Sequence, residues 1–157
     1  MNSNEIYLGE AIDVIEEILA SGGEFKMYPR GISMLPLIKQ DSDSVVLVGT
    51  EGAVLEKHDI AFYRRDNGQF VLHRIMSCEE DGTYTMCGDN QTYLECGVRA
   101  DQIIAKVSKL YKKEKLFRFD SLRYKIYLAT WCCMRVRLFL RLPKRALGKI
   151  KRIGAKL

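Results

Sequence analysis

The sequence predicts a mainly β protein: a coiled antiparallel β-barrel with a helix at its N-terminus and a basic helical tail at its C-terminus. Short apolar and β-branched runs are separated by Gly, Asn and Asp, which is typical of antiparallel strands joined by tight turns. Apolar residues recur at helical spacing near the N-terminus. The chain has 157 residues and is 47% hydrophobic, so it can bury one core and is expected to form one domain with appendages.

The N-terminal segment, residues 1–24, is predicted to contain an amphipathic helix over residues 4–20. Its apolar positions recur at steps of four, three and four, with acidic residues between them. The run Ser21-Gly22-Gly23 ends the helix. We expect the helix to pack on the domain or on a partner. The apolar positions are Leu8, Ile12, Ile15 and Leu19.

The β domain is predicted to cover residues 25–112. Alternation of side chains along a strand places His73 on the same face as Val71 and Ile75. Clusters of Asp, Asn, Ser and Gly mark the turns between the strands. The expected strands cover residues 25–28, 45–48, 60–63, 70–76, 83–86 and 103–111, with hairpin turns at 66–68 and 81–82.

One serine and one histidine form the candidate catalytic pair. Ser33 lies between Pro29 and Pro36, which predicts a turn or strand end with an exposed hydroxyl. A serine hydroxyl is a poor nucleophile at neutral pH unless a base lies within hydrogen-bond reach and a third group orients that base. His73, one of two histidines, lies in a predicted strand, and its usual pKa of about 6.5 suits a general base.

Three motifs resemble, in their order and residues, those of the clan of type I signal peptidases and LexA-type self-cleaving repressors. Gly31-Ile32-Ser33-Met34-Leu35-Pro36 is similar to the clan's nucleophile motif, Gly-x-Ser-Met-x-Pro. His73-Arg74-Ile75 resembles the base-bearing strand of the archaeal and endoplasmic-reticulum signal peptidases, where histidine stands in place of lysine. Gly88-Asp89-Asn90 is similar to the clan's Gly-Asp-Asn element. The resemblance covers roughly residues 25–110, and three ordered motifs are more specific than one.

The resemblance implies a serine endopeptidase that cleaves an extended signal or leader peptide. Ser33 would be the nucleophile and His73 the general base. Asp89 would orient His73, with Glu95 as the alternative acid, and the sequence does not choose between them. The backbone N–H of Ser33 would bind the oxyanion. The mechanism requires no cofactor and no metal. The expected peptide-binding residues are Gly31, Ile32, Met34 and Pro36.

The tail carries most of the positive charge. Residues 106–157 hold 17 Lys and Arg against 2 Asp and Glu, whereas residues 1–105 hold 8 against 18. Residues 113–157 are predicted to be basic, helical and amphipathic, and to bind an anionic membrane surface or a protein partner rather than nucleic acid. Five cations within Leu122–Leu142 make a membrane-spanning helix unfavourable. The alternative is a helical hairpin that packs on the barrel or on a partner.

Cysteine usage and the N-terminus indicate the compartment. An odd number of cysteines, five, including the adjacent Cys132 and Cys133, does not suggest a disulfide framework and favours a reducing environment. The N-terminus is acidic and lacks the basic segment and apolar core of a signal peptide. We therefore expect a cytoplasmic protein, peripheral on the inner face of the membrane if the tail binds lipid.

A second interpretation belongs to another functional class. The chain could be a non-catalytic β-barrel module that its basic tail tethers to a membrane or a partner. A LexA-like repressor is a weaker variant, because residues 1–24 supply one helix rather than a helix-turn-helix. Reactivity of Ser33 towards a serine-directed probe distinguishes the enzyme from the module.

Overall fold

The structure is a computed structural model and describes residues 8–51, 53–133 and 136–137. It divides into two compact units between Arg118 and Phe119, and each unit is described by itself. The predicted start of the N-terminal helix, residues 4–7, and the C-terminal part of the predicted basic tail, residues 138–157, lie outside the described residues.

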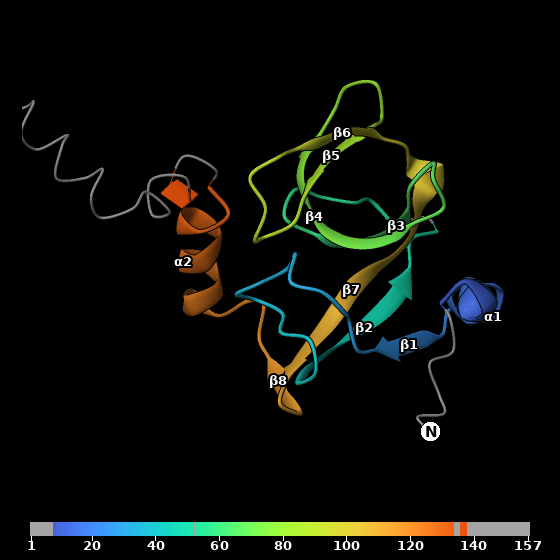
Figure 1. The fold of residues 1–157 in the computed structure, drawn as a ribbon, viewed down its shortest axis with the longest axis horizontal. Helices are drawn as coiled ribbons and strands as arrows, with labels where there is room; N and C mark the ends of the chain where they lie inside the picture. Colours follow the sequence, from blue (N-terminus) through green and yellow to red (C-terminus); the bar gives the residue numbers. More distant parts are fainter. Residues whose placement is uncertain (1–7, 52, 134–135, 138–157) are drawn as a thin grey trace, which may run out of the picture. The chain divides into compact units, whose positions relative to one another are not determined.

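The first unit is mainly β, as predicted, and its eight described strands form one antiparallel sheet (Figure 1). Their order is β1-β2-β7-β3-β4-β5-β6, and β8 pairs with β7. The six expected strands all form, and β6 and β8 are additional. The strands are β1 (Glu24–Met27), β2 (Asp43–Gly49), β3 (Ile60–Arg64), β4 (Phe70–Cys78), β5 (Tyr84–Cys87), β6 (Glu95–Val98), β7 (Ile103–Lys112) and β8 (Lys115–Phe117), with a 3-10 turn, η1 (Ala100–Gln102), before β7.

The predicted coiled barrel does not close, because the sheet is open. Closing a barrel requires the first and last strands of the order to pair in a staggered register. Here those strands are β1 and β6, each four residues long, and each pairs with one neighbour in the described part of the chain. The portion from β3 to β6 nevertheless curls round on itself (Figure 1).

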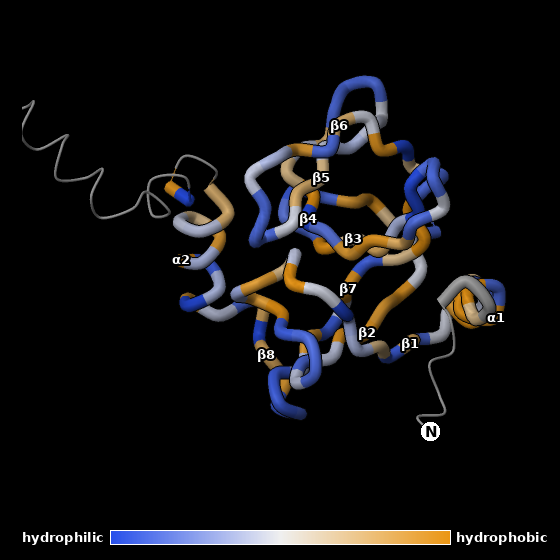
Figure 2. Tube along the Cα trace, in the orientation of Figure 1, coloured by the Kyte–Doolittle hydropathy of each residue, from blue (hydrophilic) through white to orange (hydrophobic). Residues whose placement is uncertain are grey.

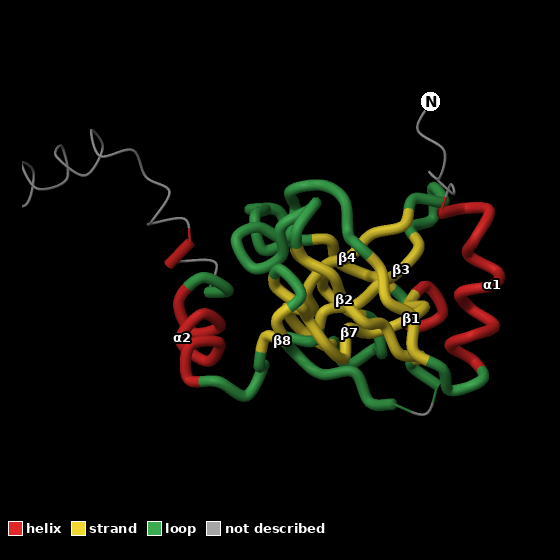
Figure 3. The backbone as a smooth tube through the Cα atoms, turned by 90° about the horizontal axis from the view of Figure 1, so that it is seen from below, coloured by secondary structure: helices red, strands yellow, loops and turns green. Residues whose placement is uncertain are grey.

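The N-terminal helix forms as predicted and packs on the sheet. α1 (Leu8–Ala20) buries Ile12, Ile15 and Leu19 and leaves Val14 58% exposed. It lies against β1 and β2, and Figure 3 shows it alongside these strands. The contact is close where β2 ends: a Cβ atom at Gly49 would lie 2.9 Å from the backbone carbonyl oxygen of Leu19. This position therefore excludes a larger residue.

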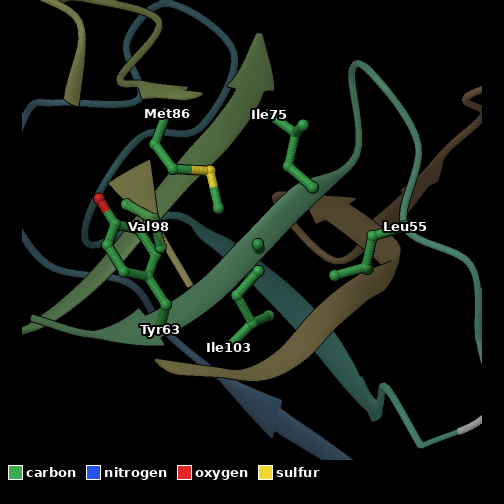
Figure 4. Close-up of a cluster of buried hydrophobic side chains, with 7 residues drawn as sticks. Leu55, Tyr63, Ile75, Met86, Val98 and Ile103 are labelled. Carbon is green, nitrogen blue, oxygen red and sulfur yellow. The ribbon is translucent and has the colours of Figure 1, made fainter. Parts of the chain in front are cut away.

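An apolar core fills the inner face of the curled portion (Figure 4). Val71 packs against this cluster and Ile75 belongs to it, so these two residues share one face of β4, as predicted. Figure 2 shows apolar stretches along β2, β3 and β7. His73 lies between Val71 and Ile75 and therefore borders the core. The cluster consists of Leu55, Ala61, Tyr63, Ile75, Met86, Val98 and Ile103.

The second unit contains α2 (Leu122–Thr130), within the segment predicted to be helical. Ser121 caps the helix by accepting a hydrogen bond of 3.3 Å from the N–H of Tyr124. The buried ring of Tyr124 contacts Phe119 and Tyr127. Over the residues that the structure describes, no helix has the length and apolar character needed to cross a bilayer.

Candidate active site

The structure brings Ser33 and His73 to one cleft, with a volume of about 270 Å³. One wall comes from the segment between β1 and β2, which carries the serine. The other lining residues come from the β3–β4 hairpin, which carries the histidine, and from the loop after β5. The lining residues are Pro29, Arg30, Gly31, Ser33, Met34, Ile38, Gln40, Arg65, Gln69, Phe70, Val71, Leu72, His73, Gln91 and Tyr93.

Ser33 lies in a turn, as the two flanking prolines predict. The N–H of Leu35 donates to the carbonyl of Ile32 at 3.2 Å, and the chain enters the turn through Gly31, whose φ is +90°. Met34 is 4% exposed and anchors the turn in the interior, whereas Ser33 itself is half-buried. The buried side chain of Met34 thus holds its neighbour Ser33 at the cleft wall.

The four predicted peptide-binding residues divide into two pairs. Gly31 and Met34 line the cleft. Ile32 and Pro36 are exposed and lie outside the cleft lining. Gly31 is further fixed by its N–H, which donates to the side-chain oxygen of Gln40 at 2.9 Å.

The Gly88-Asp89-Asn90 element holds the serine turn through the backbone and the side chain of Asn90. The N–H of Asn90 donates to the carbonyl oxygen of Ser33 at 2.7 Å, and the Asn90 side-chain amide donates to the carbonyl of Ile32 at 3.1 Å. A Cβ atom at Gly88 would lie 2.7 Å from the same Ser33 oxygen. Only glycine therefore permits this approach, which links the third motif directly to the first.

Asp89, the first candidate for the orienting acid, forms a buried salt bridge with Arg74. Its two carboxylate oxygens accept hydrogen bonds of 2.7 and 2.6 Å from the guanidinium, and both side chains are buried. Arg74 also donates to the carbonyl of His58 at 2.8 Å. Because neighbouring residues of a strand point to opposite faces, the Arg74 side chain leaves β4 on the face opposite to His73. The negative charge of Asp89 favours the protonated imidazole and so opposes, in part, the lowering of the His73 pKa by burial.

Glu95, the second candidate, reaches the imidazole through Tyr63. The Tyr63 hydroxyl lies 3.2 Å from Nδ1 of His73 and donates to Oε2 of Glu95 at 2.8 Å. The strand register explains the first contact: Ala61 pairs with His73, so Tyr63, two residues further along β3, lies on the same face. In Figure 4 the Tyr63 hydroxyl lies at the margin of the apolar cluster.

Arg65 fixes the Glu95 carboxylate. Its Nε donates to Oε1 of Glu95 at 2.8 Å, and its Nη2 donates to Oε2. The remaining Nη1 donates to the side-chain oxygen of Gln69 at 2.7 Å. Burial raises the pKa of Glu95, but the hydrogen bonds from Arg65 and Tyr63 outweigh it, so its pKa lies below the usual value. Glu95 is therefore a stable anion at neutral pH.

The imidazole of His73 is neutral at neutral pH. Burial, with 2% of the residue exposed, and the charge of Arg65 lower its pKa, while Glu95 and Asp89 oppose them, and the resulting pKa is about 4. This pKa is lower than the ordinary value that was expected from the sequence. The difference arises from the burial of the ring, which the sequence pattern does not reveal. A neutral imidazole has one nitrogen with a free lone pair and can accept a proton.

The serine and the histidine share the cleft without a direct hydrogen bond. Among the described residues, no hydrogen bond joins Ser33 Oγ to the His73 ring, and the Ser33 N–H donates to no other group. Distances between catalytic groups are often long in a free enzyme and shorten when substrate binds. The arrangement offers a hydroxyl, a neutral base and a backbone donor around one cavity.

Tyr63 and Arg65 were not among the site residues predicted from the sequence. The signal for Tyr63 was present: a hairpin centred on the predicted turn at Asn67 pairs residue 61 with 73 and residue 63 with 71, as observed. That register places a polar hydroxyl on the face of His73. Arg65 gave no comparable signal, because its partner Glu95 comes from a strand that the sequence did not reveal.

Comparisons of the chain with models of protein families, with curated proteins and with solved structures found no match.

Proposed function

We propose that the protein is a serine endopeptidase of the signal peptidase type, in its histidine branch, and that it cleaves an extended signal or leader peptide. The observation that supports this most is the convergence of the three motifs: Ser33 and His73 line one cleft, and Gly88-Asp89-Asn90 binds the serine turn. The curled antiparallel sheet is compatible with the peptidase fold, although it is open.

The reaction would begin with proton transfer. The His73 imidazole takes the hydroxyl proton of Ser33, whose Oγ attacks the peptide carbonyl carbon to form a tetrahedral intermediate and then an acyl-enzyme. The imidazolium gives its proton to the leaving amine, and water hydrolyses the ester. The backbone N–H of Ser33 would stabilise the oxyanion. A low pKa at His73 favours protonation of the leaving amine, since the imidazolium is then a strong acid.

The test uses a complex mixture of peptides. The purified protein is incubated with peptides from a digested proteome, and new termini are identified by mass spectrometry. Wild type should generate new termini, whereas Ser33→Ala and His73→Ala should generate none while keeping the wild-type circular dichroism. Ser77→Ala and His58→Asn change a serine and a histidine outside the cleft lining and serve as controls. Cleavage by either cleft variant at the wild-type rate would contradict the proposal.

The non-catalytic module remains the second candidate, and one observation favours it. His73 is almost fully buried and makes its described hydrogen bond to Tyr63 rather than to Ser33. A protein of this kind would bind peptides in the cleft without cleaving them. Intact peptides retained on the folded wild type, with no new termini, would support this function over the first.

We also propose that the protein is cytoplasmic and that its basic tail binds an anionic membrane surface. The support is the excess of Lys and Arg after residue 106. Flotation with phosphatidylserine vesicles should recover the full chain but not a chain lacking residues 119–157, a deletion that leaves β8 intact. Equal recovery of both proteins would contradict membrane binding by the tail.

A further inference from the structure

We propose that Tyr63 is a positioning residue that connects His73 to the Glu95 carboxylate and thereby holds the imidazole in its Nδ1–H form, with the lone pair on Nε2. The catalytic consequence rests on the proposed function. The protonated position of the ring is a property of the fold itself and can be measured without any substrate.

The number of protons available at Tyr63 fixes the direction of its hydrogen bonds. Tyr63 has one hydroxyl proton and two polar neighbours: Oε2 of Glu95 at 2.8 Å and Nδ1 of His73 at 3.2 Å. The carboxylate can only accept, so it takes the hydroxyl proton. The Tyr63 oxygen then presents its lone pairs to Nδ1. A hydrogen bond at that contact requires Nδ1 to carry a proton.

Both groups that share the hydroxyl proton, the Glu95 carboxylate and the Tyr63 oxygen, keep their charge at neutral pH. Two hydrogen bonds from Arg65 keep Glu95 ionised, and Gln69 accepts a further bond from the same guanidinium. Burial and the negative charge of Glu95 raise the pKa of Tyr63, so the hydroxyl keeps its proton. The direction of donation therefore stays fixed at neutral pH: from His73 to Tyr63 and from Tyr63 to Glu95.

Tyr63 and His73 are held in fixed positions by burial and by the pairing of their strands. Tyr63 is fully buried and His73 is 2% exposed, and the two residues come from adjacent paired strands, β3 and β4. Their ring centroids are 6.1 Å apart and the planes are tilted by 58°, so they meet through the hydroxyl rather than by stacking. A tyrosine serving only the apolar core would need one partner for its hydroxyl. This one has a carboxylate on one side and the imidazole on the other.

The consequence for the proposed reaction concerns the second nitrogen. A proton on Nδ1 leaves Nε2 as the acceptor for the Ser33 proton. When the imidazolium forms, its Nδ1–H remains directed at Tyr63, and the negative charge of Glu95 favours the cation. The hydroxyl of Tyr63 therefore stands between the histidine and its orienting acid, Glu95, which was one of the two acids that the sequence left open.

The experiment measures the histidine ring nitrogens of the full-length protein. The chain has two histidines, so long-range proton–nitrogen correlation spectra of ¹⁵N-labelled protein contain two ring systems, and His58→Asn assigns them. At neutral pH, His73 should be in the Nδ1–H form. In Tyr63→Phe, which keeps the ring but removes the oxygen, the nitrogen shifts should move towards the Nε2–H form. Tyr84→Phe, at another tyrosine that contacts the core cluster, should leave them unchanged.

A variant at Glu95 completes the test. Glu95→Gln supplies a second variant, because an amide can donate to the Tyr63 oxygen and weaken the fixed direction of donation; it should also shift the His73 nitrogens. An Nε2–H form in wild type, or an unchanged Nδ1–H form in Tyr63→Phe, overturns the inference.

The rate of Ser33 labelling by a fluorophosphonate separates this inference from the proposed function. Tyr63→Phe should lower that rate by roughly 10- to 100-fold, whereas Tyr84→Phe should not. Labelling that is unaffected in Tyr63→Phe, together with an unchanged tautomer, overturns the inference and leaves the proposed function in place. A tautomer that depends on Tyr63 in a protein whose Ser33 does not react supports the inference and contradicts the proposed function.

Discussion

The backbone N–H of Asn90 donates a hydrogen bond of 2.7 Å to the carbonyl oxygen of Ser33. This bond joins two motifs that lie 57 positions apart in the chain, and it fixes the serine turn against the loop that follows β5. β5 pairs with β4, which carries His73. The position of the hydroxyl relative to the imidazole therefore depends on Gly88 and Asn90, neither of which takes part in proton transfer.

The close approach at Gly88 can be tested by adding one methyl group. In Gly88→Ala the new Cβ would lie 2.7 Å from the Ser33 carbonyl oxygen, a backbone atom, so the serine turn must move. We expect a loss of about 1–3 kcal/mol in the free energy of unfolding and a loss of Ser33 reactivity. Urea unfolding and probe labelling measure the two effects.

The control is Gly82→Ala, in the hairpin after β4. Its φ of +81° disfavours alanine, but no atom lies within 4 Å of the added Cβ. It should cost about 1 kcal/mol of stability and leave Ser33 reactivity unchanged. If Gly88→Ala labels at the wild-type rate, the clamp on the serine turn is not required for reactivity.

The buried Arg74–Asp89 pair should contribute to folding far more than an exposed pair. Replacing Asp89 by Asn leaves the guanidinium of Arg74 buried without its counter-charge, which should destabilise the protein by about 3–5 kcal/mol. The exposed pair of Arg99 and Asp66 is the control, since Asp66→Asn should cost less than about 1 kcal/mol. Similar losses in the two variants, measured by urea unfolding, would mean that Asp89 is not an important partner of Arg74 for stability.

The strands and the turn at Ser33 could be predicted from the sequence because both depend on local patterns. Alternation along β4 placed His73 on one face with Val71 and Ile75, and the prolines around Ser33 predicted its turn. The open edge could not be predicted in the same way, because apolar runs identify strands but not which strands pair across the sheet. The choice between Asp89 and Glu95 depends on such pairing as well.

His58 occupies a backbone conformation that is unfavourable for histidine. Its φ is +81°, and its backbone groups are fixed by Ile75 and Arg74. His58→Gly should stabilise the protein by about 0.5–1 kcal/mol, because glycine adopts this conformation without steric cost. His58→Ala keeps the unfavourable conformation and should give no gain. Thermal unfolding of the two variants tests this, and equal melting temperatures would show that the backbone at residue 58 is not strained.

The low pKa of His73 makes stability depend on pH. The folded pKa is about 4 and the ordinary value is about 6.5, so below pH 6.5 the unfolded state binds more protons than the folded state. The stability contributed by the neutral ring is complete above pH 6.5 and is lost as the pH falls towards 4, by up to about 3 kcal/mol.

The comparison is with His73→Gln, which cannot titrate in this range. Urea unfolding of both proteins at several pH values between about 4 and 7 should give a steeper loss for wild type. The shift at His58 is also downwards and is present in both proteins, so it cancels in the comparison. Parallel curves would mean that His73 has an ordinary pKa in the folded protein.

The most direct measurement is covalent labelling of Ser33 by a fluorophosphonate, located by peptide mass spectrometry and followed as a function of pH. If His73 is the base that activates Ser33, we expect modification at Ser33 at neutral pH and none in His73→Ala. Labelling of wild type should decline as the pH falls through about 4 and His73 gains a proton. Folded wild-type protein that does not react at Ser33, or that reacts equally without His73, would contradict this role of His73.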